Sequence, residues 1–143
     1  MKTRLALLSL AAALSLASAL PAAGSVATGN DEKRLGLLAA HAGEPVERVR
    51  FIRAVHAYEV VGPLNVLIWE TPSKAWLIDL RKSAACRHLD REFAIGIDTA
   101  TDSINIRNSY IVARGGVRCR VDGIREVNVQ DWKQAERDAG IRE

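Results

Sequence analysis

Residues 65–86 constrain the fold of this 143-residue chain more strongly than any other segment. Two apolar runs, 65–70 and 75–80, are rich in Val, Leu, Ile and Trp and flank a four-residue turn, so the pattern predicts a β-hairpin. Pro72 fits this turn because its ring fixes φ and it has no N–H to donate to a ladder. If Glu70 lies opposite Ala75, strict alternation predicts one tryptophan-rich core face. That face carries Asn65, Leu67, Trp69, Trp76, Ile78 and Leu80.

Residues 1–27 have the pattern of a secretory signal peptide. Two basic residues precede an apolar stretch over residues 5–20, small residues follow, and no acidic residue is present. The apolar stretch is short for a membrane-spanning helix, so a retained anchor is the weaker alternative. Cleavage is expected after Ala19 or after Ala27, and the sequence does not choose between them. We therefore expect a periplasmic or secreted protein with no membrane span after cleavage.

The charge of the chain argues against a nucleic-acid partner. Loss of residues 1–27 removes two of the 20 basic residues and none of the 17 acidic residues, so the net charge falls from +3 to +1. The basic isoelectric point is therefore largely due to the signal peptide. About 116 residues remain, which suffice for one domain with one core. We expect a helical lead-in over residues 28–47 and a single β-rich domain over residues 48–143.

Cys86 and Cys119 are the two cysteines of the chain. An exported chain meets an oxidising compartment, where two cysteines normally pair, so we predict a disulfide between them. Closing the loop between them contributes about 3.5 to 4 kcal/mol in the chain-entropy model. A redox-active pair is disfavoured because the two cysteines lack the C-x-x-C spacing.

The other segments are predicted to form short strands and two helices. A helix capped by Asn30 or Asp31 is expected to run to Ala42, and a second helix is expected over residues 129–139. Residues 56–63 are expected to connect two strands. Strands are predicted from period-two alternation over residues 48–53, 93–97, 103–107, 110–114, 117–121 and 124–127. The predicted class is mainly β: a small antiparallel curved sheet or barrel with a short N-terminal helix and a C-terminal helix.

His41, His56 and His88 are the natural candidates for proton transfer near neutral pH, but none lies in a recognisable motif. Cys86, His88 and Asp90 imitate a metal site, which is disfavoured because Cys86 is expected to be oxidised. The sequence contains no nucleophile elbow and no phosphate-binding glycine loop. We therefore predict no catalytic residue, no metal and no cofactor. A small hydrolase that uses His56 or His88 with a carboxylate remains the enzymatic alternative.

Two surfaces are candidates for ligand binding. Arg118 and Arg120 share one face of a predicted strand, and with Arg50 they would form an anion-binding patch if the two strands were neighbours. The alternative is a solvated sheet surface. Trp69 and Trp76 would form an aromatic platform for a sugar or a peptide, and the alternative is that both belong to the core.

Five short motifs follow one another along the chain. They are 40–46 (AHAGEPV), 67–72 (LIWETP), 76–80 (WLIDL), 86–89 (CRHL) and 119–125 (CRVDGIR). In this order and spacing they resemble a family of small exported bacterial proteins known as a domain of unknown function, number 6491. The chain departs from the family pattern in Arg87-His88 before Leu89 and in Val121, which replaces an isoleucine. The resemblance implies export and a common fold, but it implies no activity, substrate or catalytic residue.

The sequence thus predicts an exported, non-enzymatic binding or envelope-associated module. It indicates a β-sheet held by a disulfide, and it contains no recognisable group of catalytic residues. An envelope component or a protein is the expected partner. Besides the hydrolase, the alternative is an inhibitor or chaperone-like protein that meets its partner through an exposed strand edge.

Overall fold

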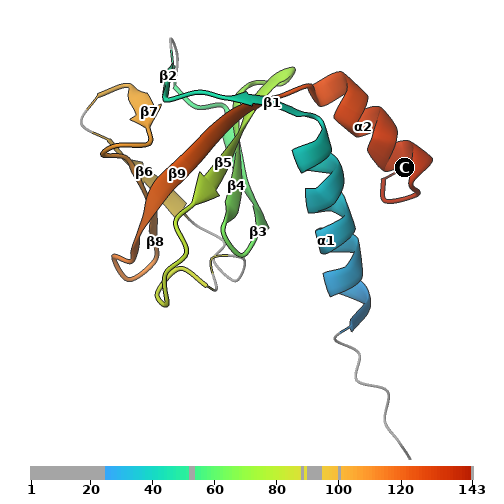
Figure 1. Cartoon of the computed structure of the whole chain (residues 1–143), viewed down its shortest axis with the longest axis horizontal. Coiled ribbons are helices and arrows are strands. Elements are labelled where there is room, and N and C mark those ends of the chain that lie inside the picture. The colour runs from blue at the N-terminus through green and yellow to red at the C-terminus, as the bar shows by residue number, and fades with distance from the viewer. Residues whose placement is uncertain (1–24, 52–53, 88, 90–94, 100, 143) are drawn as a thin grey trace, which may run out of the picture.

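The computed structural model describes residues 25–51, 54–87, 89, 95–99 and 101–142. Two helices, α1 (Ser25–Ala40) and α2 (Val129–Asp138), lie at the two ends of this part of the chain (Figure 1). Neither of these helices is long and apolar enough to span a membrane. The strands are β1 (Ala42–Pro45), β2 (Arg48–Arg50), β3 (Ala57–Gly62), β4 (Asn65–Thr71), β5 (Lys74–Leu80), β6 (Ile95–Asp98), β7 (Ser103–Asn105), β8 (Tyr110–Ala113) and β9 (Arg118–Val127).

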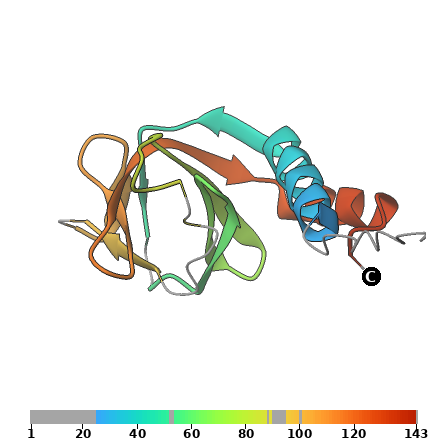
Figure 2. The same cartoon turned by 90° about the horizontal axis from the view of Figure 1, so that it is seen from below.

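Seven strands form one antiparallel sheet that curls into a half-barrel. Its order is β3-β4-β5-β9-β8-β6, and β1 pairs with β9 beside this path. Among the described strands, β2 and β7 pair only with each other and form a separate ribbon. Figure 2 shows the curl of the sheet, with both helices outside it. The predicted class, a mainly antiparallel curved sheet with a helix near each end of the chain, is confirmed.

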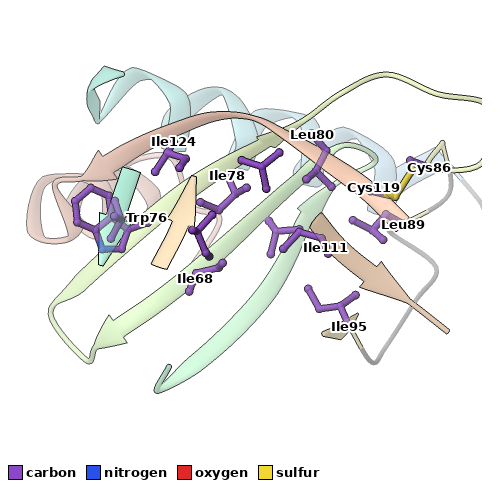
Figure 3. Close-up of a cluster of buried hydrophobic side chains, with 14 of the residues drawn as sticks. Ile68, Trp76, Ile78, Leu80, Cys86, Leu89, Ile95, Ile111, Cys119 and Ile124 are labelled. Carbon is purple, nitrogen blue, oxygen red and sulfur yellow. A yellow bond between two sulfur atoms is a disulfide. The ribbon is translucent and has the colours of Figure 1, made fainter. Parts of the chain in front are cut away.

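The concave face of the sheet encloses the larger core (Figure 3). Side chains of β4, β5, β8 and β9 meet there with Val49 and Ile104 of the ribbon. Each fully buried aliphatic side chain stabilises the fold by about 1.5 to 3 kcal/mol. The fully buried members from the sheet include Val66, Ile68, Ile78, Ile111, Val121 and Ile124.

The convex face of the sheet is buried against the two helices. Leu38 of α1 and Trp132 of α2 pack with Leu67, Leu77 and Val127 of the sheet. The central strands β4 and β5 are therefore buried on both faces. This explains why each strand contains a run of four consecutive apolar residues, 66–69 in β4 and 75–78 in β5, instead of alternating with polar residues.

The hairpin of β4 and β5 forms as predicted, but the predicted register is wrong. Thr71 pairs with Lys74 beside the turn, and a bulge in the ladder then shifts the register, so that Trp69 pairs with Ala75 and not with Trp76. A shift of one residue exchanges the two faces of a strand. Trp76 consequently lies in the concave core and Trp69 packs against the convex core.

Helix α1 starts earlier than the sequence predicted. It begins at Ser25, so Asn30 and Asp31 lie inside the helix and do not cap it. Extending a helix that has already formed costs little, which explains why a favourable capping residue does not stop it. The helix ends at Ala40 and β1 follows directly. Residues 1–24 of the predicted signal peptide lie outside the described residues.

Helix α2 agrees closely with its prediction. The side chain of Asn128 caps it by accepting a hydrogen bond from the backbone N–H of Asp131 at 3.3 Å. Gly140 follows the end of the helix with a φ of +65°, a conformation that a Cβ atom disfavours. The helix buries Val129, Trp132 and Glu136.

Several of the remaining strands differ from their predictions. Strand β1 begins at Ala42, where the predicted helix was expected to end. Residues 57–62, predicted to be part of a connecting segment, form β3, so this prediction is wrong. Strand β9 is one continuous strand of ten residues where two strands were predicted. The predicted strands over residues 110–114 and 117–121 form a hairpin of β8 and β9: Tyr110 pairs with Arg120, and Gly115 and Gly116 have positive φ values in its turn.

Candidate functional site

The two edges of the curled sheet meet at a seam between β3 and β6. These strands end the order of the sheet, and neither has a strand partner on its outer side among the described residues. Five antiparallel pairings separate them, so β3 and β6 run in opposite directions. The backbone N–H of Ile95 donates a hydrogen bond to the hydroxyl of Tyr58 at 3.2 Å, which bridges the seam. An unpaired strand edge is a template for a further strand.

An apolar cavity of about 480 Å³ opens at this seam. Tyr58 is 42% exposed, and it is one of two large hydrophobic side chains among the described residues that are exposed. The volume of the cavity falls within the range of small ligand sites. Its lining consists of Val55, His56, Ala57, Tyr58, Ile95 and Ile97.

The described histidines lie apart from each other. His56 lines the seam cavity, and none of the described lining residues is a carboxylate. His41 lies with Glu126 in a groove of about 740 Å³ between the end of α1 and the start of α2, where its carbonyl oxygen accepts a hydrogen bond from the N–H of Asn128. His88 lies outside the described residues. The part of the chain that the structure describes also contains no group of three His, Cys, Asp or Glu side chains that would hold a metal.

The arginines predicted to form an anion patch are not brought together by strand pairing. Strand β9, which carries Arg118 and Arg120, pairs with β1, β5 and β8, whereas the β2 strand of Arg50 pairs with β7. The condition for this patch, that the two strands lie side by side in one sheet, is therefore not met among the described strands. Arg118 forms an ion pair with Asp98 at 2.6 Å, and Arg120 donates a hydrogen bond to the carbonyl oxygen of Arg107 at 2.9 Å. Both side chains are thus already engaged within the protein.

Trp69 and Trp76 do not form one aromatic platform, because they lie on opposite faces of the sheet. Trp69 packs against Trp132 with 6.1 Å between ring centroids. The Nε1–H of Trp76 donates a hydrogen bond to Glu70 at 3.1 Å, and Lys74 forms an ion pair with the same carboxylate at 3.1 Å. The hydrogen bond from Trp76, followed by Lys74, lowers the pKa of Glu70, while partial burial opposes this shift.

Cys86 and Cys119 are joined by a disulfide within the concave core, with 5.8 Å between their Cα atoms. Cys119 lies on β9 and is fully buried, and Cys86 is only 2% exposed. Figure 3 shows the bond beside Leu89. The disulfide ties the loop after β5 to β9 from inside the sheet, and it leaves neither thiol free to bind a metal.

A partly buried ion cluster that was not predicted from the sequence links both helices to the sheet. Glu136 of α2 is fully buried, and Arg34 of α1 donates its Nε–H to it at 2.7 Å. The same guanidinium binds both carboxylate oxygens of Glu59 on β3, at 2.6 and 3.1 Å, and lies over the ring of Trp132. The hydrogen bonds with Glu59 and Glu136 raise the pKa of Arg34, although burial opposes the shift. The partners lie 25 and 102 residues from Arg34, so local patterns do not predict the cluster.

The seam also escaped prediction. Tyr58 belongs to the segment 56–63, which was predicted to connect two strands, and its partner Ile95 lies 37 residues further along the chain. Tyr58 and Val60 alternate on the concave side of β3, a pattern that indicates a strand. The adjacent apolar residues Val60 and Val61 hide this alternation in the sequence.

The fold and the seam define the class of this protein: a small disulfide-linked half-barrel with two helices on its convex face and an open seam between its edge strands. The chain belongs to a family of unknown function (DUF6491), whose model matches residues 1–143. No curated protein and no solved structure matches the chain. The match confirms the family predicted from the motifs, and it assigns no activity to the chain.

Proposed function

We propose that this protein is an exported, non-enzymatic binding module that takes up an extended polypeptide segment of a partner at the seam between β3 and β6. The observation that carries this proposal is the apolar cavity between two opposed strand edges, with Tyr58 exposed beside it. Addition of a strand to a sheet edge gives affinity through main-chain hydrogen bonds and specificity through pockets for alternate side chains.

The width of the seam supports a single guest strand. Tyr58 on β3 reaches the N–H of Ile95 at the start of β6, so one tyrosine side chain plus one hydrogen bond spans the gap. The two edges are therefore at most about two inter-strand spacings of about 4.8 Å apart at this point, so no more than one additional strand fits between them. The guest would replace the hydroxyl of Tyr58 as the partner of the Ile95 N–H.

Strand β3 is the more favourable edge for the guest. It has six residues, whereas β6 has four. Because β3 and β6 run in opposite directions, a guest that is antiparallel to β3 is parallel to β6. Antiparallel pairing is slightly more stable per residue, so the guest is expected to pair antiparallel with β3. Alternate side chains of the guest would then enter the cavity between Tyr58 and Ile97.

Export is part of the proposal and is supported by the pattern of residues 1–27 and by the paired cysteines. Intact mass and thiol titration of protein isolated from the producing cell test it. A mature mass that begins after Ala19 or Ala27, with no free thiol before reduction, supports export. Cleavage after Ala19 would keep α1 whole, whereas cleavage after Ala27 would remove its first three residues. A full-length mass with two free thiols would overturn it.

Peptide binding to the oxidised protein tests the seam. A panel of seven-residue peptides with alternating apolar and polar side chains is titrated by calorimetry, and the best peptide is remade with N-methyl groups on alternate residues. We expect a Kd below about 1 mM for the unmodified peptide and a loss of at least about ten-fold on methylation of the paired edge. Hydrogen exchange should slow at the β3 amides.

Two substitutions of the same type localise the binding. Ile97→Glu places a charge in the cavity and should weaken peptide binding by about ten-fold or more. Val46→Glu alters the other exposed large hydrophobic residue, outside the cavity, and should leave binding unchanged. If no peptide binds, or if both variants weaken binding equally, the seam is not the binding site.

A further inference from the structure

The ribbon of β2 and β7 presents two arginines on one face. Arg48 and Arg50 are two residues apart on β2, and both are exposed. Val49 between them is buried in the concave core. Since side chains alternate along a strand, Arg48 and Arg50 point away from the core in the same direction, with their Cα atoms about 7 Å apart.

These two arginines differ from most others in the described structure. Arg34, Arg81, Arg107, Arg118, Arg125 and Arg142 form ion pairs. No ion pair and no side-chain hydrogen bond joins Arg48 or Arg50 to another described residue. Both guanidinium groups are thus exposed to solvent and have no hydrogen-bond or ion-pair partner among the described residues.

Two polar clefts adjoin this arginine face. One, of about 540 Å³, is lined by Arg48 and Arg50 together with Thr101, Asp102 and Ser103. The other, of about 380 Å³, is lined by Arg48 with Glu47, Asn105, Arg107 and Asn108. Arg48 belongs to both, so the clefts adjoin each other along the ribbon. None of these residues lines the seam cavity.

The polar groups around Arg48 add further donors. The Oδ1 atom of Asn105 accepts hydrogen bonds from the backbone N–H groups of Arg107 and Asn108, at 3.0 and 2.9 Å. This arrangement leaves the amide N–H groups of Asn105 available to a ligand. Glu47, which lines the second cleft, forms an ion pair with Arg107 at 3.4 Å. Asp102 makes no ion pair with Arg48 or Arg50, and it is the one acid in the first cleft.

We propose that this face binds a small ligand with two oxyanion groups, phosphate or carboxylate, held about 7 Å apart by its own skeleton. Each guanidinium would take one oxyanion through two parallel N–H···O bonds, a geometry that arginine provides and lysine does not. The spacing of the two arginines along β2 selects for two groups on one molecule. This site is independent of peptide binding at the seam.

Titration of the oxidised protein with inorganic phosphate and with fructose 1,6-bisphosphate, followed by NMR, tests the proposal. The bisphosphate should bind at least about ten-fold more tightly than inorganic phosphate, because its second group meets the second arginine. Arg48→Gln and Arg50→Gln should each remove this difference. Arg50→Lys should restore little of it, since the charge remains but the planar fork is lost.

Two further variants distinguish a specific site at Arg48 and Arg50 from non-specific attraction of the bisphosphate to any exposed arginine. Arg87→Gln removes another exposed arginine and should leave the bisphosphate affinity unchanged. Asp102→Asn removes the acid of the first cleft and should raise the affinity by about two-fold to five-fold. If Arg87→Gln weakens binding as much as Arg50→Gln, or if both ligands bind equally, the proposal is refuted. All of these positions are exposed, so circular dichroism should confirm that each variant folds.

Discussion

Replacement of Arg34 by methionine tests how the two helices are held on the sheet. Arg34 contacts a fully buried carboxylate on α2, a 40% exposed carboxylate on β3, and the ring of Trp132. Methionine keeps a long apolar side chain beside Trp132 and removes the positive charge. Among the described residues, Glu136 would then keep one ion pair, with Arg142; it is longer, at 3.4 Å, and Arg142 is 53% exposed.

Arg34→Met should lower the free energy of unfolding, because it leaves the buried carboxylate of Glu136 with one weak ion pair. Removing one partner of a buried pair costs about 3 to 5 kcal/mol, and the remaining Arg142 contact lowers this to about 3 kcal/mol. The bidentate bond to Glu59 is half-buried, and its loss is expected to add about 1 kcal/mol, the upper end of the range for exposed pairs. Arg34→Met combined with Glu136→Met leaves no buried charge, so the double variant should lie within about 1 kcal/mol of the wild type.

Urea unfolding of the oxidised protein, followed by tryptophan fluorescence, measures these free energies. Glu59→Gln is the matched control, since it removes the other carboxylate from the same guanidinium at a half-buried position, and it should cost about 1 kcal/mol. The m-value should stay constant across the set. Two results would contradict this reasoning: an equal loss of unfolding free energy in Arg34→Met and Glu59→Gln, or a double variant as unstable as Arg34→Met. Either result would show that the unpaired buried carboxylate of Glu136 is not the main cause of the lost stability.

Two further predictions concern the disulfide and the hairpin. Alanine at both Cys86 and Cys119 should lower the free energy of unfolding by about 3.7 kcal/mol, the chain-entropy value for a sequence separation of 33 residues; denaturation that matches the oxidised wild type would contradict this. Glu70 has a lowered pKa, so its contribution to stability is complete above its ordinary value of 4.5 and is lost as the pH falls through the lowered value. Unfolding free energies measured from pH 6 to pH 2 should therefore fall less steeply in Glu70→Gln, and identical slopes would refute the coupling with Trp76.

The sequence predicted the hairpin of β4 and β5 but not its register, and the reason is physical. Alternation fixes the faces of a strand only where one face is polar. Here both faces are covered, the concave one by the curl of the sheet and the convex one by the helices. A bulge next to the turn, between Trp69 and Thr71, therefore leaves no trace in the apolar pattern. Helix α2 was predictable because its signals, Asn128 and Gly140, are local.

The candidate sites were hard to predict because each depends on contacts between distant segments. Arg50 was identified as a ligand for anions, but its expected partners, Arg118 and Arg120, lie on a strand that does not pair with β2. The neighbour that matters is Arg48 on the same strand, where the two-residue period alone places both side chains on one face. That inference was within reach of the sequence once residues 48–50 were taken as a strand.

The motifs that carry the family resemblance lie in the scaffold and outside both proposed sites. They coincide with β1, with the two central strands, with the loop of the disulfide and with β9. Neither the seam residues Tyr58 and Ile97 nor the arginines of β2 fall within them. These motifs therefore belong to the strands and the disulfide that form the half-barrel and connect it to its helices. A relative that keeps them but has other residues at positions 48 and 50 should fold alike and lose the bisphosphate preference, so the ligand of each member is best sought in the segments between the motifs.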